Sequence, residues 1–103
     1  MKNPMELSEE ELRKCVEKCI HTIGLDYEKP FRRGGILIYK PYRNYFTTYV
    51  GEFPWPDLER AGFAKHSNSV ILEDGTEKTC YFLTPDGLQW LARELKICIC
   101  LTY

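Results

Sequence analysis

The clearest order of elements lies in residues 55–95, which are WPDLERAGFAKHSNSVILEDGTEKTCYFLTPDGLQWLAREL. Two apolar runs, 70–72 and 79–83, flank an Asp-Gly pair at 74–75, and such a pair favours a type I′ hairpin turn. A threonine and a proline then begin the segment 84–95, whose leucines have helical spacing. These residues therefore predict a β-hairpin that is followed at once by a closing helix.

Shorter elements precede this hairpin. Residues 51–56 contain two prolines and predict a turn, and residues 56–61 predict a short helix that ends at Gly62. Residues 36–40 are mostly apolar and predict a short strand, which Pro41 breaks because proline has no backbone donor.

The aromatic stretch 42–50, YRNYFTTYV, is compatible with two structures. Its aromatic and β-branched residues favour a strand. The spacing of its rings is helical, and Pro41 suits a first helical position. We expect a helix here, with a strand as the alternative, and we expect a loop over 25–35.

The N-terminal part predicts a helix over residues 8–23. Ser8 and Glu11 have the spacing of a capping box, in which each side chain bonds to the other residue's backbone. Apolar residues recur at three-and-four spacing up to Ile23, and Gly24 is placed to end the helix. The apolar stripe predicts a core-facing helix, and a dimer seam is the alternative.

Length and composition predict one soluble α+β domain, residues 1–103. Hydrophobic residues make up 44% and charged residues 28%, as in ordinary globular proteins. No run approaches the roughly 18 apolar residues of a membrane span. No apolar stretch follows Lys2, so we expect no secretory signal and a cytoplasmic location.

Five cysteines predict reduced thiols rather than disulfides, because their number is odd and no export signal is expected. Their spacing differs from the knuckle of a structural zinc site, so we expect small buried apolar side chains and no metal. Two of them, Cys98 and Cys100, alternate with apolar residues over 97–101, which predicts a strand with both faces covered.

The charge distribution is uneven along the chain. The net charge is −1, but residues 29–49 hold five basic residues and no acid. A phosphate-bearing ligand is therefore expected there, because arginine forks pair with phosphates and aromatic rings stack on bases. Gly34 and Gly35 let backbone amides approach a phosphate. The candidate ligand-binding residues are Lys29, Arg32, Arg33, Tyr39, Lys40, Tyr42, Arg43 and Tyr45.

This segment has alternative interpretations. The rings can belong to the core beneath a solvated basic surface, or the segment can form a protein interface, since tyrosine and arginine are enriched in both kinds of site. If it binds a ligand, its parts suit a single strand, a loop or a free nucleotide better than duplex DNA.

Catalysis has little support in the sequence. His21 and Asp26 are close enough for an acid–base pair, but no nucleophile accompanies them. The chain has no phosphate-binding loop, zinc-protease helix or dinucleotide fingerprint. We therefore predict no enzymatic activity, no catalytic residue and no cofactor.

Residues 55–95 resemble the back half of a winged-helix domain. The matching positions are Leu58 and Gly62 before the hairpin, and Leu83, Thr84 and Gly87 after it. The resemblance implies a winged-helix-like α+β domain with an N-terminal helix, a short strand, short helices, a β-hairpin wing and a C-terminal helix. The sequence departs from DNA-binding members, because acidic residues occupy the short helix and the wing tip.

Three further stretches, HTIGLDYEKPF, YKPYRNYF and the ending from YFLT, resemble small uncharacterised proteins of bacteriophages and prophages of Gram-positive bacteria. This resemblance implies action in a host cytoplasm. The first hypothesis is a non-enzymatic protein that binds a nucleic acid or nucleotide through 29–49.

The second hypothesis is an inhibitor or adaptor that binds a host protein complex, such as an anti-defence protein. Its interface would be acidic and would include Glu73, Asp74, Glu77, Asp57 and Glu59. A winged-helix transcriptional regulator is a third hypothesis, and the sequence does not fix the oligomeric state.

Overall fold

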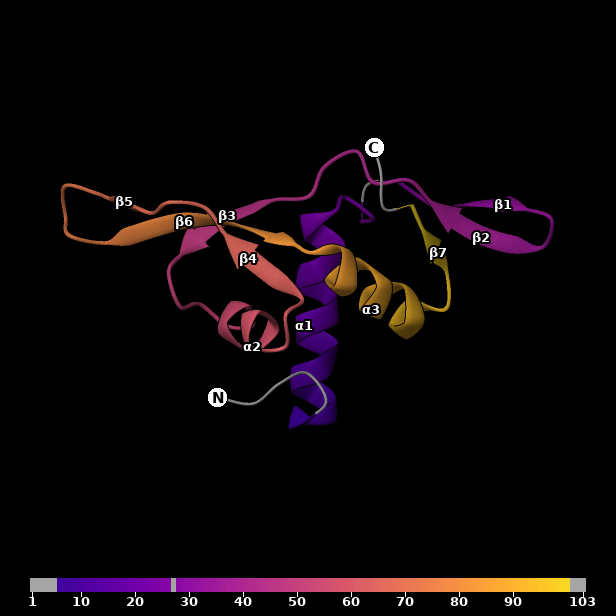
Figure 1. Ribbon diagram of the computed structural model, residues 1–103, viewed down its shortest axis with the longest axis horizontal. Coiled ribbons are helices and arrows are strands. Elements are labelled where there is room, and N and C mark those ends of the chain that lie inside the picture. Colours follow the sequence, from indigo (N-terminus) through magenta and orange to yellow (C-terminus); the bar gives the residue numbers. More distant parts are fainter. Residues whose placement is uncertain (1–5, 27, 101–103) are drawn as a thin grey trace.

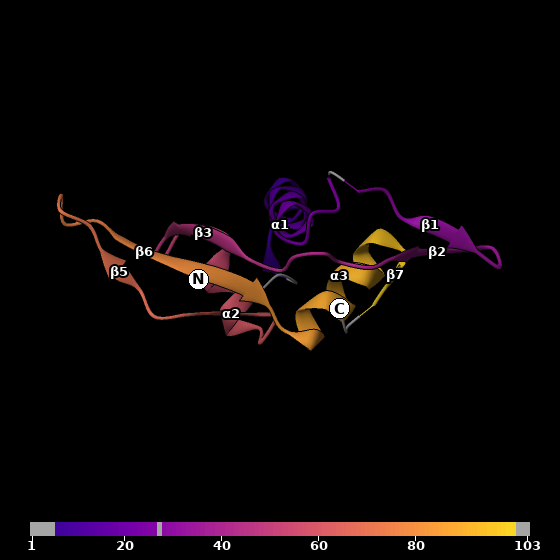
Figure 2. The same cartoon turned by 90° about the horizontal axis from the view of Figure 1, so that it is seen from above.

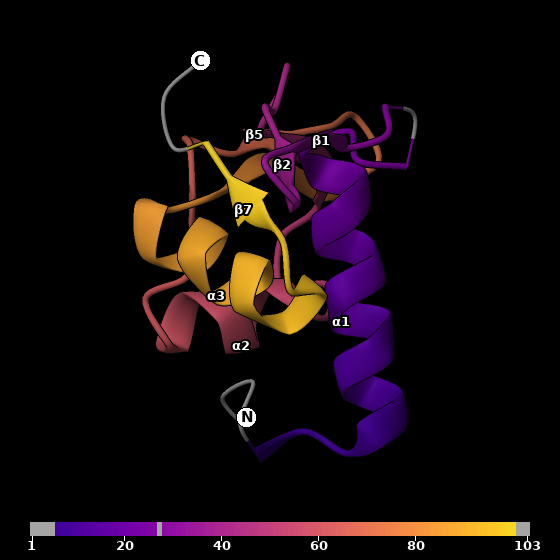
Figure 3. The same cartoon turned by 90° about the vertical axis from the view of Figure 1, so that its right-hand side faces the viewer.

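Three helices lie on one side of two small β-sheets in the computed structural model, which describes residues 6–26 and 28–100 (Figure 1; Figure 3). The helices are α1 (Glu9–Thr22), α2 (Trp55–Arg60) and α3 (Pro85–Leu95). Sheet A has the order β1 (Phe31–Arg33), β2 (Ile36–Tyr39), β7 (Cys98–Ile99). Sheet B has the order β3 (Phe46–Tyr49), β6 (Glu77–Leu83), β4 (Ala64–His66), with β5 (Val70–Ile71) also paired to β6. The predicted α+β class is therefore confirmed.

Helix α1 forms as its sequence predicts. The Ser8 hydroxyl accepts from the Glu11 backbone, and the Glu11 side chain accepts from the Ser8 backbone, which completes the capping box. Gly24 ends the helix with a φ of +79° and donates to the carbonyl of His21. The positive φ favours glycine, and a Cβ added at Gly24 would lie 2.3 Å from the ring of Tyr42, which would have to move.

The predicted loop over 25–35 is wrong at its end, where β1 begins. β1 and β2 form an antiparallel hairpin in which Arg33 pairs with Ile36 across a two-residue turn. Gly34 and Gly35 both have positive φ, +58° and +81°, as a type I′ turn requires. The hairpin forms because this glycine pair closes two short runs of strand-compatible residues.

The predicted helix over 42–50 is also wrong, because the chain forms β3 instead. All four residues of β3 pair with β6. Just before β3, the side-chain amide of Asn44 donates to the carbonyl of Leu83 and accepts from its N–H. The backbone hydrogen bonds of 46–49 are therefore made to β6 rather than within a helix. The described residues contain no helix between α1 and α2.

The hairpin predicted around Asp74 and Gly75 is confirmed, but its turn differs from type I′. Only Gly75 has a positive φ, +89°, and its N–H donates to the carbonyl of Leu72. The Asp74 carboxylate accepts from both the N–H and the hydroxyl of Thr76. These bonds give a three-residue turn that joins β5 to β6.

The predicted closing helix is confirmed as α3. The Thr84 hydroxyl accepts from the N–H of Gly87 and caps the helix. A Cβ at Gly87 would lie 2.0 Å from the carbonyl oxygen of Phe63, so α3 packs directly on the backbone. Beyond α3, β7 runs parallel to β2. Its exposed Cys98 shows that the prediction of two covered faces is wrong, and residue 101 of that predicted strand lies outside the described residues.

Aromatic rings form the centre of the core. The fully buried ring of Trp55 stacks on Tyr81 at 4.8 Å between centroids and on Phe46 at 6.1 Å. Trp90 is also buried and stacks on Phe63, so both tryptophans are core residues. The described helices include none that is long and apolar enough to cross a bilayer.

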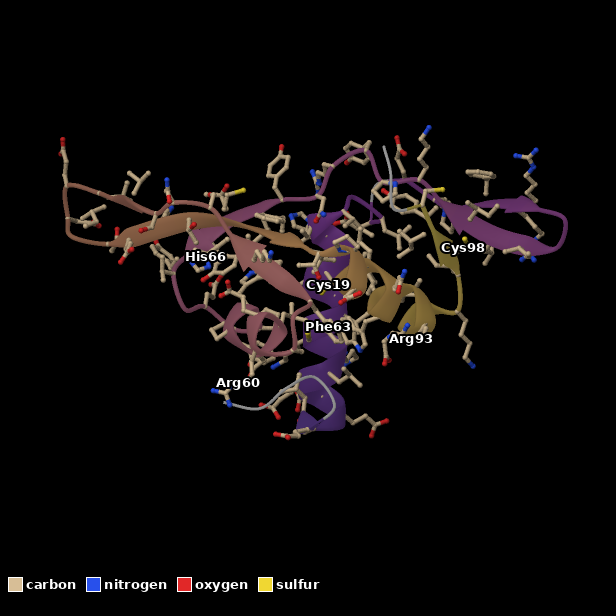
Figure 4. All side chains as sticks on the ribbon, in the orientation of Figure 1. Cys19, Arg60, Phe63, His66, Arg93 and Cys98 are labelled. Carbon is tan, nitrogen blue, oxygen red and sulfur yellow. The ribbon has the colours of Figure 1, made fainter. Side chains whose placement is uncertain are left out.

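The five cysteines divide by burial. All five are free, and Cys15 and Cys19 are fully buried on α1. The hydrogen bond with Cys15, together with burial, raises the pKa of the Cys19 thiol, which stays neutral in the core. These two are the small apolar core residues that the sequence predicts, whereas Cys98 on β7 is exposed (Figure 4).

Candidate nucleic-acid interface

Sheet B has one buried face and one open face. Along β6, Thr79, Tyr81 and Leu83 are buried and point toward the core, where Tyr81 stacks on Trp55 of α2. The alternate residues of β6 are only partly covered and point the other way. We call the helix-packed side of each sheet the inner face and the opposite side the outer face. Seen from above in Figure 2, β6 crosses in front of α2.

The outer face of sheet B carries rows of side chains across its strands. Tyr49, Lys78 and Val70 occupy one row, and the Lys78 ammonium lies 4.9 Å from the centre of the Tyr49 ring. Lys65 lies opposite Phe82 in another row. Tyr45 precedes β3 with the same alternation.

Two of these rings are open to solvent. Tyr45 is 56% exposed and Tyr49 is 49% exposed. They are four residues apart on one extended segment, a separation of about 13 Å at about 3.3 Å per residue. The face therefore presents separate aromatic surfaces on which flat ligands can stack.

A shallow groove lies on this face of sheet B. Its volume is about 370 Å³, and its lining includes Thr47 and Lys78. Val70 and Leu72 give it an apolar side, and Cys80 contributes from the middle of β6. The groove thus combines an ammonium group with apolar walls.

Sheet A also has an outer face, which includes one side of the β1–β2 hairpin. Tyr39 and Ile99 pair across β2 and β7 and are both buried, so they define the inner face. The alternate residues Phe31, Arg33 and Ile36 lie on the outer face and are exposed. Sheet A therefore adds an aromatic ring and a guanidinium to the same kind of surface.

Every charged residue at an outer-face position of the described strands is basic. These residues are Arg33 on β1, Lys65 on β4 and Lys78 on β6. The one acidic strand residue, Glu77, has inner-face alternation and lies at the start of β6. Because all three charges are positive, this partly apolar surface attracts anions in preference to cations.

The structure separates the predicted ligand-binding residues. Those that reach the surface are Lys29, Arg32, Arg33, Lys40, Tyr42 and Tyr45. Arg32 and Arg33 are neighbours on β1 and therefore point to opposite faces. The Arg32 guanidinium also donates to the carbonyl of Gly35. Of these residues, Arg33 and Tyr45 lie on the outer faces, and Lys40 and Tyr42 are exposed between the two sheets.

Tyr39 has a structural position instead. Its side chain is 2% exposed, and its hydroxyl donates to the carbonyl of Ile23 at 2.7 Å. Burial raises the pKa of Tyr39 to about 12. Tyr39 therefore joins sheet A to the end of α1 and is inaccessible to a ligand.

Arg43 is also occupied by the fold. Its guanidinium donates to the carbonyl of His21 at 2.7 Å and lies 4.0 Å from the Asp26 carboxylate. The carboxylate also bonds to the His21 ring at 2.7 Å. That hydrogen bond, with a smaller contribution from Arg43, holds the pKa of Asp26 below its usual value. Arg43 therefore stabilises the end of α1.

Two histidine–carboxylate pairs lie at the ends of the inner aromatic row. The His21 ring contacts Phe46 edge-on and pairs with Asp26, and the His66 ring contacts Tyr81 edge-on and pairs with Glu59. His66 is on the α2 side of the molecule in Figure 4. No three metal-binding side chains come together among residues 6–26 and 28–100.

The sequence interpretation missed Tyr49, Lys65, Lys78 and Phe82 as members of one face. The alternation in EKTCYFL, where polar or partly exposed residues separate Thr79, Tyr81 and Leu83, was the available signal. The helical spacing of the rings in 42–50 hides this signal, because a helix there leaves β6 without a strand partner on one side.

Comparisons with known proteins add no relative to this description. No family model, no curated protein and no solved structure matches the chain. The assignment of a function to the outer faces therefore rests on their own chemistry.

Proposed function

We propose that the protein binds single-stranded nucleic acid on the outer faces of its sheets and has no catalytic activity of its own. The observation that carries this proposal is the pairing of exposed rings with basic residues alone at the outer-face positions. Bases stack on aromatic rings without strong sequence preference, while ammonium and guanidinium groups neutralise the backbone. This proposal keeps the phosphate-bearing ligand of the sequence hypothesis and moves its centre from 29–49 to sheet B.

Each exposed ring has a role in this proposal. A base stacks on Tyr49, and Lys78, which already lies against that ring, pairs with a neighbouring phosphate. A second base stacks on Tyr45, with Lys65 nearby across β6. Arg33, Lys40 and Tyr42 extend the path toward sheet A. A strand bound this way would run along the long axis of the molecule.

Duplex DNA suits this surface less well. Major-groove recognition needs an exposed helix that can enter the groove. The short helix α2 instead carries Glu59, whose negative charge opposes phosphates, while its second acid, Asp57, is buried and reaches no ligand surface. We further propose a winged-helix-like arrangement for residues 55–95 alone, supported by their order α2, β4, hairpin, α3. In this proposal the outer face of the sheet contacts nucleic acid, and neither a recognition helix nor the acidic wing tip does.

The direct test is fluorescence anisotropy with labelled 15-nucleotide single strands of DNA and RNA, a matching duplex, and free nucleotides as competitors. We expect binding that favours single strands and weakens between 50 and 150 mM salt. Replacing both Tyr45 and Tyr49 by alanine should weaken it at least tenfold, since one stacked base contributes about 1–3 kcal/mol. Lys65→Glu with Lys78→Glu should also flatten the salt dependence.

Matched controls lie on the helix side of the molecule. Phe53 is an exposed ring and Lys14 an exposed lysine, and both line a surface hollow beside α1. Phe53→Ala and Lys14→Glu should leave binding unchanged. Absence of binding at 50 mM salt, or equal losses in the control variants, would contradict the proposal.

A second candidate function is the phage or prophage inhibitor that binds a host protein in the cytoplasm. The acidic tip of the β5–β6 hairpin, with Glu73, Asp74 and Glu77, favours it. Neutralising these three acids should leave oligonucleotide binding intact. If the wild-type protein binds no oligonucleotide at any salt concentration, this candidate takes precedence.

A further inference from the structure

Two hairpins project from the molecule in opposite directions along its longest axis (Figure 1). One is formed by β1 and β2, and we call residues 31–39 the basic arm. The other joins β5 to β6, and we call residues 70–77 the acidic arm. The molecule measures 51 × 28 × 20 Å, and its radius of gyration of 14.2 Å exceeds the value of about 13 Å for a compact chain of this length.

Both arms expose apolar side chains. Phe31 and Ile36 lie on the outer face of the basic arm, where Phe31 pairs with Ile38 and Ile36 pairs with Arg33. Both apolar side chains are more than half exposed. On the acidic arm, Val70 is 62% and Ile71 is 72% exposed, and Leu72 follows them. Single exposed apolar residues are ordinary, but a consecutive run with a matching patch elsewhere indicates a contact surface.

The two arms carry opposite charges. The basic arm holds Arg32 and Arg33, and no acid lies within it. The acidic arm holds Glu73, Asp74 and Glu77. Hydrogen bonds from Thr76 lower the pKa of Asp74, so its carboxylate is ionised at neutral pH. Each arm is therefore repelled by its own kind and attracted by the other kind.

Both arms also end in an edge strand. β1 pairs only with β2, and β5 pairs only with β6, so each described strand leaves one backbone edge without a strand partner. Such edges accept a strand from another chain unless like charges oppose it. Here charge repulsion opposes pairing of two basic arms or of two acidic arms. Pairing of a basic arm with an acidic arm meets no such repulsion.

We propose that the basic arm of one copy docks on the acidic arm of a second copy. Because the arms lie at opposite ends, the contact is head-to-tail and leaves a free arm at each end of a pair. Rows longer than two copies then form as the concentration rises. This inference shares Arg33 and Val70 with the outer faces but needs no ligand, so association is measured without nucleic acid and its failure is distinguishable from failure of nucleic-acid binding.

The contact is small, because each arm is a few residues long. Interfaces well below the standard 1,600 Å² of total buried area are usually weak. We therefore expect association in the range of about 10 µM to 1 mM protein, and weaker association at higher salt because the charges are exposed.

Sedimentation velocity of the full chain without nucleic acid, from 10 µM to 1 mM, tests the proposal with two charge-reversed variants. One carries Arg32→Glu and Arg33→Glu, and the other carries Glu73→Lys and Asp74→Lys. Each variant alone should stay monomeric where the wild type forms rows. An equimolar mixture should associate again, because the intact acidic arm of the first variant meets the intact basic arm of the second.

Matched controls are Arg93→Glu and Glu94→Lys on the exposed side of α3, which should leave association unchanged. Ile71→Ser should reduce association at least severalfold while circular dichroism shows an intact fold. Three results would overturn the proposal: a wild type that is monomeric up to 1 mM, assembly that stops at a dimer, or a mixture of the two variants that remains monomeric.

Discussion

Both faces of sheet B carry aromatic residues, but those of the inner face are packed in the core and those of the outer face are exposed. On the inner face, Phe46 and Tyr81 stack against Trp55 and exclude water. On the outer face, Tyr45 and Tyr49 come from the same segment of chain, yet about half of each side chain remains exposed. An offset of one residue along a strand thus decides whether an aromatic ring stabilises the fold or is available to a ligand.

The two faces contribute differently to the free energy of folding. Burying an aromatic side chain stabilises the folded state by several kilocalories per mole, so exposed rings forgo a contribution that inner rings make. A chain that leaves Tyr45, Tyr49 and the apolar residues of β5 in solvent is expected to cover them with partners. The predictions below separate stability from binding on this basis.

The largest expected effect is on the inner face. Trp55→Ala should lower the free energy of unfolding by about 3–5 kcal/mol, because it removes a fully buried ring that stacks on both neighbours. Urea denaturation followed by circular dichroism measures the change. A loss below about 1 kcal/mol would show that the aromatic row does not hold sheet B to α2.

The outer face should give the opposite pattern. Replacing Tyr45 and Tyr49 by alanine should change the free energy of unfolding by no more than about 1 kcal/mol, as for exposed sites. The same double variant should lose at least tenfold in affinity for single strands. If unfolding is affected as strongly as in Trp55→Ala, the two faces do not differ in the way described.

Gly87 tests how closely α3 is packed. Gly87→Ala places a methyl group against the carbonyl of Phe63, which also accepts from the N–H of Thr84 and cannot move freely. We expect a loss of about 1–3 kcal/mol in unfolding free energy from overpacking. Gln89→Ala, at an exposed position of the same helix, is the control, and both are measured by urea denaturation.

The smallest effect concerns pH. The pKa of Asp26 is lowered in the folded state, so its contribution to stability is present above the unfolded value near 3.8 and is lost as the pH falls through the folded value. Urea midpoints between pH 2 and 6 should therefore fall at the acidic end more in the wild type than in Asp26→Asn. Identical pH profiles would show that the His21–Asp26–Arg43 cluster adds nothing to the end of α1.

Sequence patterns predicted the elements that depend on local signals. The capping box at Ser8, the glycine end of α1, the threonine cap of α3 and the Asp-Gly hairpin all act within a few residues. The strand β3 could not be found in this way, because its partner β6 lies about 30 residues away and decides its structure. Helical spacing of rings in 42–50 was therefore misleading.

The candidate site was predictable only in part. Charge counting placed cations and rings together in 29–49, and this set includes Arg33 and Tyr45, which lie on the outer faces. It could not show that Tyr39 reaches the carbonyl of Ile23 or that Arg43 reaches that of His21, because both contacts join residues far apart in the chain. Lys65 and Lys78 join the surface only through strand pairing.

The most direct test of the outer-face account is a ¹⁵N-labelled NMR titration with a 15-nucleotide single strand at 50 mM salt. The account predicts amide shift changes concentrated on β3, β4 and β6, centred on Tyr49 and Lys78, with α1 and α2 unaffected. Shift changes confined to the helix side, or none at saturating oligonucleotide, would contradict it.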